Sequence, residues 1–278
     1  MTRKSLDFFY RQERIPWFSQ DKVNSTIITL LGVGGIGTNI AMLAARLGVG
    51  KIHLVDMDII EGSNLNRQIL YSKDNIGDKK VIRAKETLDN LDNLTSEIFA
   101  HNYDIFEDWT KTIDIVKESD YILNGLDQPE IKRTLIGVLC FALKTPMIYS
   151  GTDPYSGYSG MILYQASKSQ EPCHECLQAI LNSLEEESLQ TKYTVNNIQS
   201  FKSVDWKELE PKNFKKAPPG ATTVVTAMFS SLLAMNQVIR DLHNQDCPHR
   251  IIFDLFSDSV ERFFLKKRDD CLVCGDIT

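Results

Sequence analysis

Four glycines in a short run could bring a phosphate group close to the backbone. They are Gly32, Gly34, Gly35 and Gly37, and they directly follow an apolar segment, Ile27–Leu31. Such glycines permit a tight turn, a close phosphate and a closely packed helix, whose free N–H groups attract an anion. Asp56 follows about 20 residues later, where a ribose-binding acid is expected. The motif predicts a nucleotide site without choosing between NAD and ATP; the alternative is a turn with only a structural role.

A polar cluster follows this acid. Its members are Asp58, Asn64, Arg67, Gln68 and Lys80. An arginine can hold phosphate oxygens with two parallel hydrogen bonds, and a lysine acts as a point charge. The cluster therefore favours a triphosphate that is cleaved over a dinucleotide that is only bound. The alternative is a surface loop followed by a basic helix start.

Four cysteines form two widely separated Cys-x-x-Cys pairs. They are Cys173 and Cys176 in the middle of the chain, and Cys271 and Cys274 near its end. Two such pairs supply four thiolates for one tetrahedral zinc ion, and a site filled by four thiolates is structural. The pattern predicts a zinc clasp between the middle and the end of the chain. A redox pair, for which a thioredoxin-like context is missing, and unrelated thiols are the alternatives.

The elements that position these residues alternate between strands and helices. Expected strands are Ile27–Leu31, Lys51–Asp56, Glu97–His101, Tyr121–Asn124 and Met147–Ser150, with helices from the glycines to Leu47, over Lys79–Leu91 and over Pro129–Ala142. Near-continuous apolar strands that alternate with helices are typical of a parallel sheet covered on both faces. The first half of the chain therefore predicts an open α/β fold with helices on both sides of a mostly parallel sheet.

The pattern changes after about residue 150. We expect a strand at Met161–Gln165, a long buried helix at Thr222–Leu242, and a terminal hairpin of Arg250–Phe256 and Arg262–Lys266 with its turn near Asp258 and Ser259. The polar composition of residues 184–219 predicts a long, partly mobile loop; a solvated helix over Leu181–Leu189 is the alternative for its start. The hairpin's phenylalanines, Phe253, Phe256, Phe263 and Phe264, are either core or a docking face.

Composition excludes several classes of protein. The 278 residues are 42% hydrophobic and 24% charged, which is ordinary for a globular chain and excludes a disordered or fibrous one. The net charge of −6 argues against bulk binding to nucleic acid. Neither a signal peptide nor a membrane-spanning stretch is evident, so we expect a cytoplasmic protein whose six cysteines stay reduced.

The run GVGGIG…DMD…SNLNRQ…K resembles the adenylating family of ThiF, MoeB and the ubiquitin-like-protein activating enzymes. The resemblance extends from Tyr10 to Gly275, and its SNLNRQ segment is highly specific. It implies one Rossmann-like adenylation domain over residues 1–278, with a mixed C-terminal half and a structural zinc clasp. Residues 1–26 would form an N-terminal arm and 27–150 the nucleotide-binding half. Residues 151–278 would bind the carrier protein and zinc, with a crossover loop at about 184–219.

The resemblance also implies roles for individual residues. Asp56 would hold the ribose, Asn64 and Arg67 the phosphates, and Lys80 the phosphate chain. Asp127, at the end of Asn124-Gly125-Leu126-Asp127, would bind magnesium; without the resemblance, a helix cap before Pro129 explains it equally well. Arg11, within Tyr10-Arg11-Gln12, would reach the partner's ATP in a homodimer; the alternative is an exposed basic residue.

The implied reaction is the ATP- and magnesium-dependent adenylation of the C-terminal carboxylate of a ubiquitin-like or sulfur-carrier protein, typically one that ends in Gly-Gly. Many relatives carry a catalytic cysteine in the crossover loop, but no cysteine lies between Leu177 and Asp246. Cys140 is expected in the core and Cys247 in a loop. The chemistry should therefore stop at the acyl-adenylate unless an external thiol or amine attacks it. A downstream sulfur donor or conjugating enzyme would then complete the pathway.

Three other functions stay open at this point. A relative of the same type adenylates a ribosomal peptide in antibiotic biosynthesis, often with an additional N-terminal recognition domain for which the 26 residues before the first strand leave little room. An NAD-dependent dehydrogenase would have no use for the SNLNRQ segment and Lys80. A non-catalytic scaffold subunit would have no physical need for the full set of charged residues.

Overall fold

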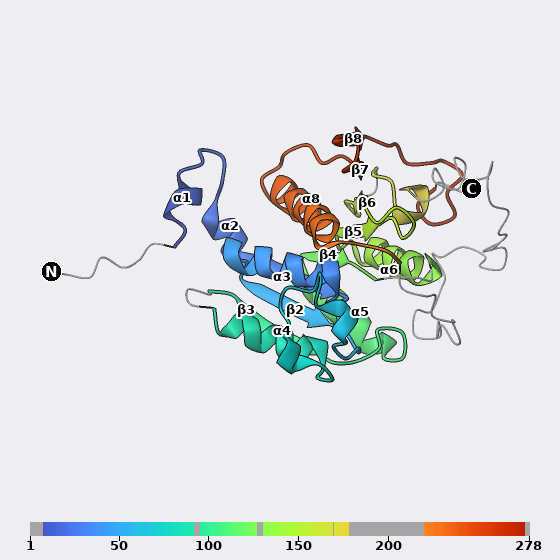
Figure 1. Ribbon diagram of the computed structural model, residues 1–278. Coiled ribbons are helices and arrows are strands. Elements are labelled where there is room, and N and C mark those ends of the chain that lie inside the picture. The colour runs from blue at the N-terminus through green and yellow to red at the C-terminus, as the bar shows by residue number, and fades with distance from the viewer. Residues whose placement is uncertain (1–7, 92–94, 127–129, 169, 178–219, 276–278) are drawn as a thin grey trace.

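The computed structural model describes residues 8–91, 95–126, 130–168, 170–177 and 220–275 (Figure 1). The expected crossover loop at 184–219 and Asp127 lie outside the described residues.

Eight strands of the described chain form one sheet, in the order β3-β2-β1-β4-β5-β6-β7-β8. The strands are β1 Ile27–Leu31, β2 Lys51–Val55, β3 Glu97–His101, β4 Tyr121–Asn124, β5 Met147–Thr152, β6 Ser159–Gln165, β7 Arg250–Asp254 and β8 Ser259–Phe263. Pairing is parallel from β3 to β5 and antiparallel from β5 to β8. The mostly parallel sheet with a mixed C-terminal part is therefore confirmed.

Helices cover both faces of this sheet (Figure 1). On one face lie α3 Gly35–Leu47, α4 Lys80–Asp89 and α8 Val224–Leu242; on the other lie α5 Trp109–Glu118 and α6 Glu130–Leu143. Short elements complete the described chain: α1 Tyr10–Glu13, α2 Gln20–Ser25, and the 3-10 turns Gly62–Asn64 and Lys73–Asn75. Two buried apolar clusters, one on each face, hold the layers together.

The strand order reverses between β1 and β4. From β1 the chain passes through α3 to β2 on one side, whereas from β4 it passes through α6 to β5 on the other. In an open α/β sheet, ligands bind in the crevice outside the carboxyl ends of the strands at such a point. The glycine run, which follows β1 directly, therefore lies where the fold provides a binding site.

One element was missed and one expectation was wrong. Helix α5 was not anticipated, because its threonine and isoleucine residues have modest helix propensity and its stability comes from burial of residues such as Trp109 and Val116. The last strand is Ser259–Phe263 and not Arg262–Lys266. The Asp254 carboxylate accepts a hydrogen bond from the N–H of Phe256 at 2.7 Å, which turns the chain and ends β7 two residues early.

Helix α8 is long, as expected, but it buries only one face, and Val225, Met228 and Leu232 are exposed. Its contact face contains small and polar residues, including Ala234, Ser230 and Ser231, and it lies side by side with α3 in Figure 1. The hydroxyl of Ser231 donates to the carbonyl of Ile36 at 3.0 Å, which ties α8 to the first turn of α3. Among the described residues, no helix combines the length and the apolar character needed to cross a membrane.

Candidate active site

The glycines after β1 have distinct structural roles. Gly32 has φ +91°, a left-handed conformation that favours glycine, and its N–H donates to the Val55 carbonyl at 2.9 Å. A Cβ on Gly37 would overlap the carbonyl of Gly32, so the fold itself requires glycine there. At Gly34 a Cβ would meet only the Gln68 amide nitrogen, at 3.7 Å. The space beside Gly34 is therefore open, and a side chain at this position would partly fill it.

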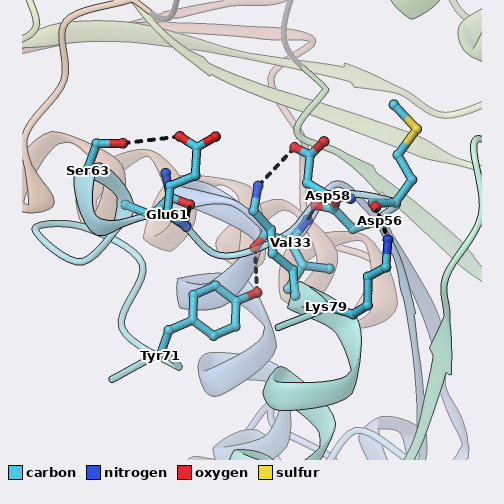
Figure 2. A network of polar contacts seen from close by, with 10 residues as sticks. Val33, Asp56, Asp58, Glu61, Ser63, Tyr71 and Lys79 are labelled. Atoms are coloured by element: carbon cyan, nitrogen blue, oxygen red, sulfur yellow. Dashed lines mark hydrogen bonds and ion pairs between the residues drawn. The ribbon is translucent and has the colours of Figure 1, made fainter. Parts of the chain in front are cut away.

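Asp56 holds this turn in shape (Figure 2). Its Oδ2 accepts the Val33 N–H at 2.7 Å, and its Oδ1 accepts the Asp58 N–H at 2.8 Å. From the other side, the Tyr71 hydroxyl donates to the Val33 carbonyl at 2.8 Å. Burial, together with the charges of Asp56 and Asp58, raises the pKa of Tyr71, so the phenol stays protonated. A carboxylate has about four acceptor positions, so Asp56 keeps capacity for a ribose hydroxyl.

Lys80 begins α4 beneath the same turn. Its Nζ lies 3.0 Å from Oδ2 of Asp58, and only 9% of its side chain is exposed. Its backbone N–H also donates to the Asp58 carbonyl, at 3.1 Å. The lysine is therefore a buried cation held at a fixed place beside the carboxyl end of β2.

Arg67 places a second cation above the glycines. Its aliphatic chain lies against Gly35, where a Cβ would be 3.2 Å from its Cγ. Its Nη1 donates to the Ser63 carbonyl at 2.9 Å and to Oδ1 of Asn66 at 3.0 Å. Within the described part of the chain, no carboxylate lies within ion-pair distance of Arg67. Its charge is therefore available to an anion that enters over the glycines.

Two amide side chains complete this part of the site. Oδ1 of Asn64 accepts the Glu61 N–H at 3.0 Å, so Asn64 also shapes the loop that carries Arg67. Gln68 is only 3% exposed, and its Oε1 has no hydrogen-bond partner among the described residues. A buried acceptor without a partner beside an open glycine indicates space for a polar ligand. These features fit a nucleotide triphosphate.

Arg11 does not join these residues within one chain. The arm that carries it packs at the far end of α3, where the Phe9 ring lies against Gly48 and Gln12 donates to the Leu47 carbonyl at 3.1 Å. Since α3 has 13 residues, its ends are about 20 Å apart. Arg11 is exposed at that end, beyond the reach of its own glycine turn.

The four paired cysteines meet in one buried cluster. The sulfur of Cys173 lies 3.9 Å from that of Cys176 and 3.6 Å from that of Cys271, and Cys176 lies 3.3 Å from Cys274. All four sulfurs lie within 4.8 Å of one another. These separations are too long for disulfides and match the spacing of about 3.8 Å that a tetrahedral zinc shell requires. The cluster fits a structural zinc ion.

Buried polar contacts fix the two arms of this clasp. His249 bridges them: its Nε2 lies 2.6 Å from the Glu171 carboxylate, and its Nδ1 accepts the Leu265 N–H at 2.9 Å. Gln165 at the end of β6 accepts the His174 N–H at 2.5 Å and donates to the Gly137 carbonyl at 2.9 Å. Burial lowers the pKa of His174 to about 3. His174 therefore stays neutral, and with four sulfurs present it is not needed as a ligand.

Burial determines the state of the remaining cysteines and shows which of the hairpin's phenylalanines lie in the core. Cys140 is fully buried in α6, as expected for a core residue, and burial raises the pKa of its thiol. Burial likewise raises the pKa of Cys247 to about 11. Phe253 lies in the core, whereas 76% of Phe256 and 63% of Phe264 are exposed.

Residues with no recognisable signal also shape the site. Tyr71, Gln165 and His249 were missed, because each acts through a partner that is distant in the sequence. A lone tyrosine, glutamine or histidine within an ordinary segment carries no motif.

The ThiF family matches residues 8–273, nearly the whole chain. The chain belongs to the ThiF family. The sulfur carrier protein adenylyltransferase of Thermus thermophilus is 22% identical over 291 residues, which cover 99% of this chain and 93% of that protein. The molybdopterin-synthase adenylyltransferase of Escherichia coli is 28% identical over 161 residues, which cover 58% of this chain and 62% of that protein.

Solved structures with a similar fold are known. A crystal structure of E. coli MccB with ATP superimposes with a TM-score of 0.72 at 21% identity, and covers 98% of this chain and 75% of that one. This likeness shows the fold. Family membership and the adenylyltransferase names of the relatives support an adenylyltransferase activity for this chain.

Proposed function

We propose that this protein uses ATP and magnesium to adenylate the C-terminal carboxylate of a small carrier protein, one with a slim tail such as Gly-Gly. A carboxylate oxygen attacks the α-phosphorus in line, an acyl-adenylate forms, and pyrophosphate leaves. The carboxylate is already ionised at pH 7, so no general base is required. Catalysis would come from positioning and from charge stabilisation on the phosphates.

The observation that carries this proposal is Arg67 above the glycine turn. Its guanidinium is bonded to a carbonyl and an amide, and no described carboxylate neutralises it. A cation without a carboxylate partner, together with the buried Lys80 near the carboxyl end of β2, suits negative charge that increases as a phosphate bond breaks. Asp56 would hold the ribose and Gln68 a polar group of the nucleotide.

We propose that Asp127 would hold magnesium, which would supply positive charge to stabilise the phosphates. Asp127 follows β4, whose last residue Asn124 places its Oδ1 3.1 Å from the Leu126 N–H. That contact orients the chain as it leaves the sheet beside the switch point.

A homodimer would complete the site. Arg11 is exposed, and the length of α3 separates it from its own glycine turn. If it stabilises phosphate charge, it must do so in a second copy of the chain. Exposed apolar residues on the same arm, Phe8, Tyr10 and Trp17, suit such a contact.

The adenylate would not be converted to a thioester on this chain. The thiol of Cys247 is held protonated at neutral pH, and Cys140 is inaccessible. An external thiol or amine, from a sulfur donor or a conjugating enzyme, would have to attack the adenylate. A complex with the carrier that reducing agents break would contradict this.

Isotope exchange between pyrophosphate and ATP tests the proposal. We expect exchange that requires magnesium and an added carrier protein with a free Gly-Gly carboxylate. Arg67→Ala should reduce the rate by at least about a hundredfold. Arg83→Ala is the matched control, because Arg83 lies on α4 and is already paired with Asp78 and Glu86. Exchange that proceeds without an added carrier protein would refute the proposed function. Equal exchange rates in Arg67→Ala and Arg83→Ala would refute the role of Arg67.

Adenylation of a short peptide is the second candidate. The solved structures that cover this chain include the Microcin C7 biosynthetic enzyme MccB in complex with N-formylated MccA, with a TM-score of 0.67. A peptide that supports exchange when Gly-Gly carrier proteins do not would select this function.

A further inference from the structure

An arginine and a tyrosine lie together at the carboxyl end of the sheet, apart from the residues assigned to the nucleotide. Arg133 in α6 donates a hydrogen bond from Nη1 to the Tyr149 hydroxyl, and its guanidinium carbon lies 4.8 Å from the centre of the Tyr149 ring. Tyr149 is buried, so its ring forms a fixed platform for the guanidinium. None of the proposed steps so far uses this pair.

The register of the sheet places the pair beside the proposed reaction centre. Tyr149 is paired with Asn124, the last residue of β4, three positions before Asp127. A Cβ on Gly151 would overlap the Tyr149 hydroxyl, so the ring extends along β5 toward the carboxyl end of the strand. The side chain of Arg133, early in α6, meets it there, since side chains on a helix tilt toward its N-terminus. The fold thus delivers a cation next to the switch point.

The charge of Arg133 is not neutralised by the described protein. Arg133 forms no ion pair with any described carboxylate, and its side chain is partly exposed. The neighbouring ring of His174, edge-on to Tyr149 at 6.4 Å, is only 2% exposed, and neither of its nitrogens has a hydrogen-bond partner among the described residues. Among the described residues, the Arg133 guanidinium is therefore left with a phenol hydroxyl and with no anionic partner.

We propose that Arg133, held by Tyr149, binds the free carboxylate of the acyl substrate and presents it to the nucleotide. This rests on the proposed function, because that reaction brings a carboxylate to the same end of the sheet. Without a cation of its own, the carboxylate would be repelled by the triphosphate. Arg67 and Lys80 would already be engaged by the phosphates. A guanidinium can hold one carboxylate oxygen while the other attacks. Gly151 matters indirectly, since it makes room for the ring that positions the arginine.

A binding comparison tests this without relying on turnover. The probes are two synthetic peptides with the same Gly-Gly-ended sequence, one with a free carboxylate and one with a C-terminal amide. Wild-type protein should bind the acid at least about tenfold more tightly than the amide, a preference of 1.4 kcal/mol or more. Arg133→Ala should reduce the preference to about twofold or less, and Arg133→Lys should keep part of it. Tyr149→Phe keeps the aromatic platform but loses the hydroxyl. Its preference for the acid should lie between those of the wild type and Arg133→Ala.

Controls separate this role from folding and from the function of the rest of the site. Arg83→Ala should keep the wild-type preference, and each variant should bind ATP within about twofold of wild type and retain its Tm. No preference in the wild type, or a preference that survives in folded Arg133→Ala, overturns the proposal. A preference that depends on Arg133 in a protein with no pyrophosphate exchange would uphold this site and refute the proposed function instead.

Discussion

The side-chain amine of Lys80 lies 3.0 Å from a carboxylate oxygen of Asp58. This pair keeps a buried cation oriented beside the glycine turn before any nucleotide arrives. A phosphate that approached Lys80 would have to compete with this carboxylate for the amine. The carboxylate also keeps the lysine from being left unpaired in the interior, which would be costly.

Lys80→Met should remove catalysis and leave the fold intact. Methionine fills a similar volume without the charge, so pyrophosphate exchange should fall by about a hundredfold or more. Asp58→Asn, which keeps a hydrogen-bond acceptor for the amine, should have a smaller effect on exchange. The exchange assay and a thermal melt measure both. Near-normal exchange in a well-folded Lys80→Met variant would show that the lysine is structural.

Gly34→Ala and Gly37→Ala should separate ligand binding from folding. At Gly34 the nearest atom to an added Cβ is 3.7 Å away, so the fold should tolerate alanine while ATP affinity decreases. At Gly37 the added Cβ would overlap the Gly32 carbonyl, so the protein should lose stability or fail to fold. Calorimetric titration with ATP and thermal melts distinguish the two. Equal loss of Tm in both variants would contradict this division of roles.

Two inactive variants should restore activity when they are combined. Arg11→Ala and Arg67→Ala chains, co-expressed with different tags, would form heterodimers with one site that has both arginines. Pyrophosphate exchange in the purified heterodimer should recover to a substantial part of the wild-type rate. Arg11 lies at the opposite end of α3 from its own glycine turn, so recovery cannot arise within one chain. Confirmed heterodimers without recovery would exclude a shared site.

The purified protein should contain about one zinc ion per chain, as four thiolates complete one tetrahedral shell. Cys271→Ser should lower Tm more than it lowers the rate of adenylation, because the cluster is buried and offers no open position. His249→Ala should speed the release of zinc to a chelator, since His249 bridges the segments that lead to both cysteine pairs. Cys140→Ser is a control that leaves the four ligands unchanged. Zinc content unaffected by Cys271→Ser would refute the clasp.

Stability should fall as the pH is lowered below about 6.5. His53 and His101 have ring nitrogens 2.9 Å apart; burial lowers the pKa of both, and the charge of His101 lowers that of His53 further. The unfolded chain then binds more protons than the folded chain below its ordinary histidine pKa. The free energy of unfolding declines there by about 1.4 kcal/mol per pH unit for each extra proton.

Chemical denaturation at several pH values measures this slope. The double variant His53→Gln, His101→Gln should show a shallower slope between pH 6.5 and 5 than wild type. The nearby carboxylate of Glu118, 3.8 Å from His53, opposes the shift and remains in both proteins. Equal slopes in the wild type and the double variant would show that groups other than His53 and His101 cause the pH dependence.

The sequence predicted the elements whose pattern is local. The glycines, the apolar strands β1 and β2, and the paired cysteines each carry their chemistry within a few residues, and the structure places them as expected. Helix α5 was missed because its buried face is created by the sheet against which it packs. The hydrogen bond from the Val33 N–H to the Asp56 carboxylate could not be foreseen, because only the parallel register of the strands brings these two residues together.

Residues 220–275 contact the earlier part of the chain at more places than the cysteine cluster. Residues 220–275 supply α8, which packs on α3 and β5, two strands that continue the sheet from β6, and two of the four sulfurs. The described parts before residue 178 and after residue 219 therefore share one sheet, one helix layer and one cysteine cluster. If the chain were cut between these two parts, the sheet, the helix layer and the cysteine cluster that they share would favour their staying associated.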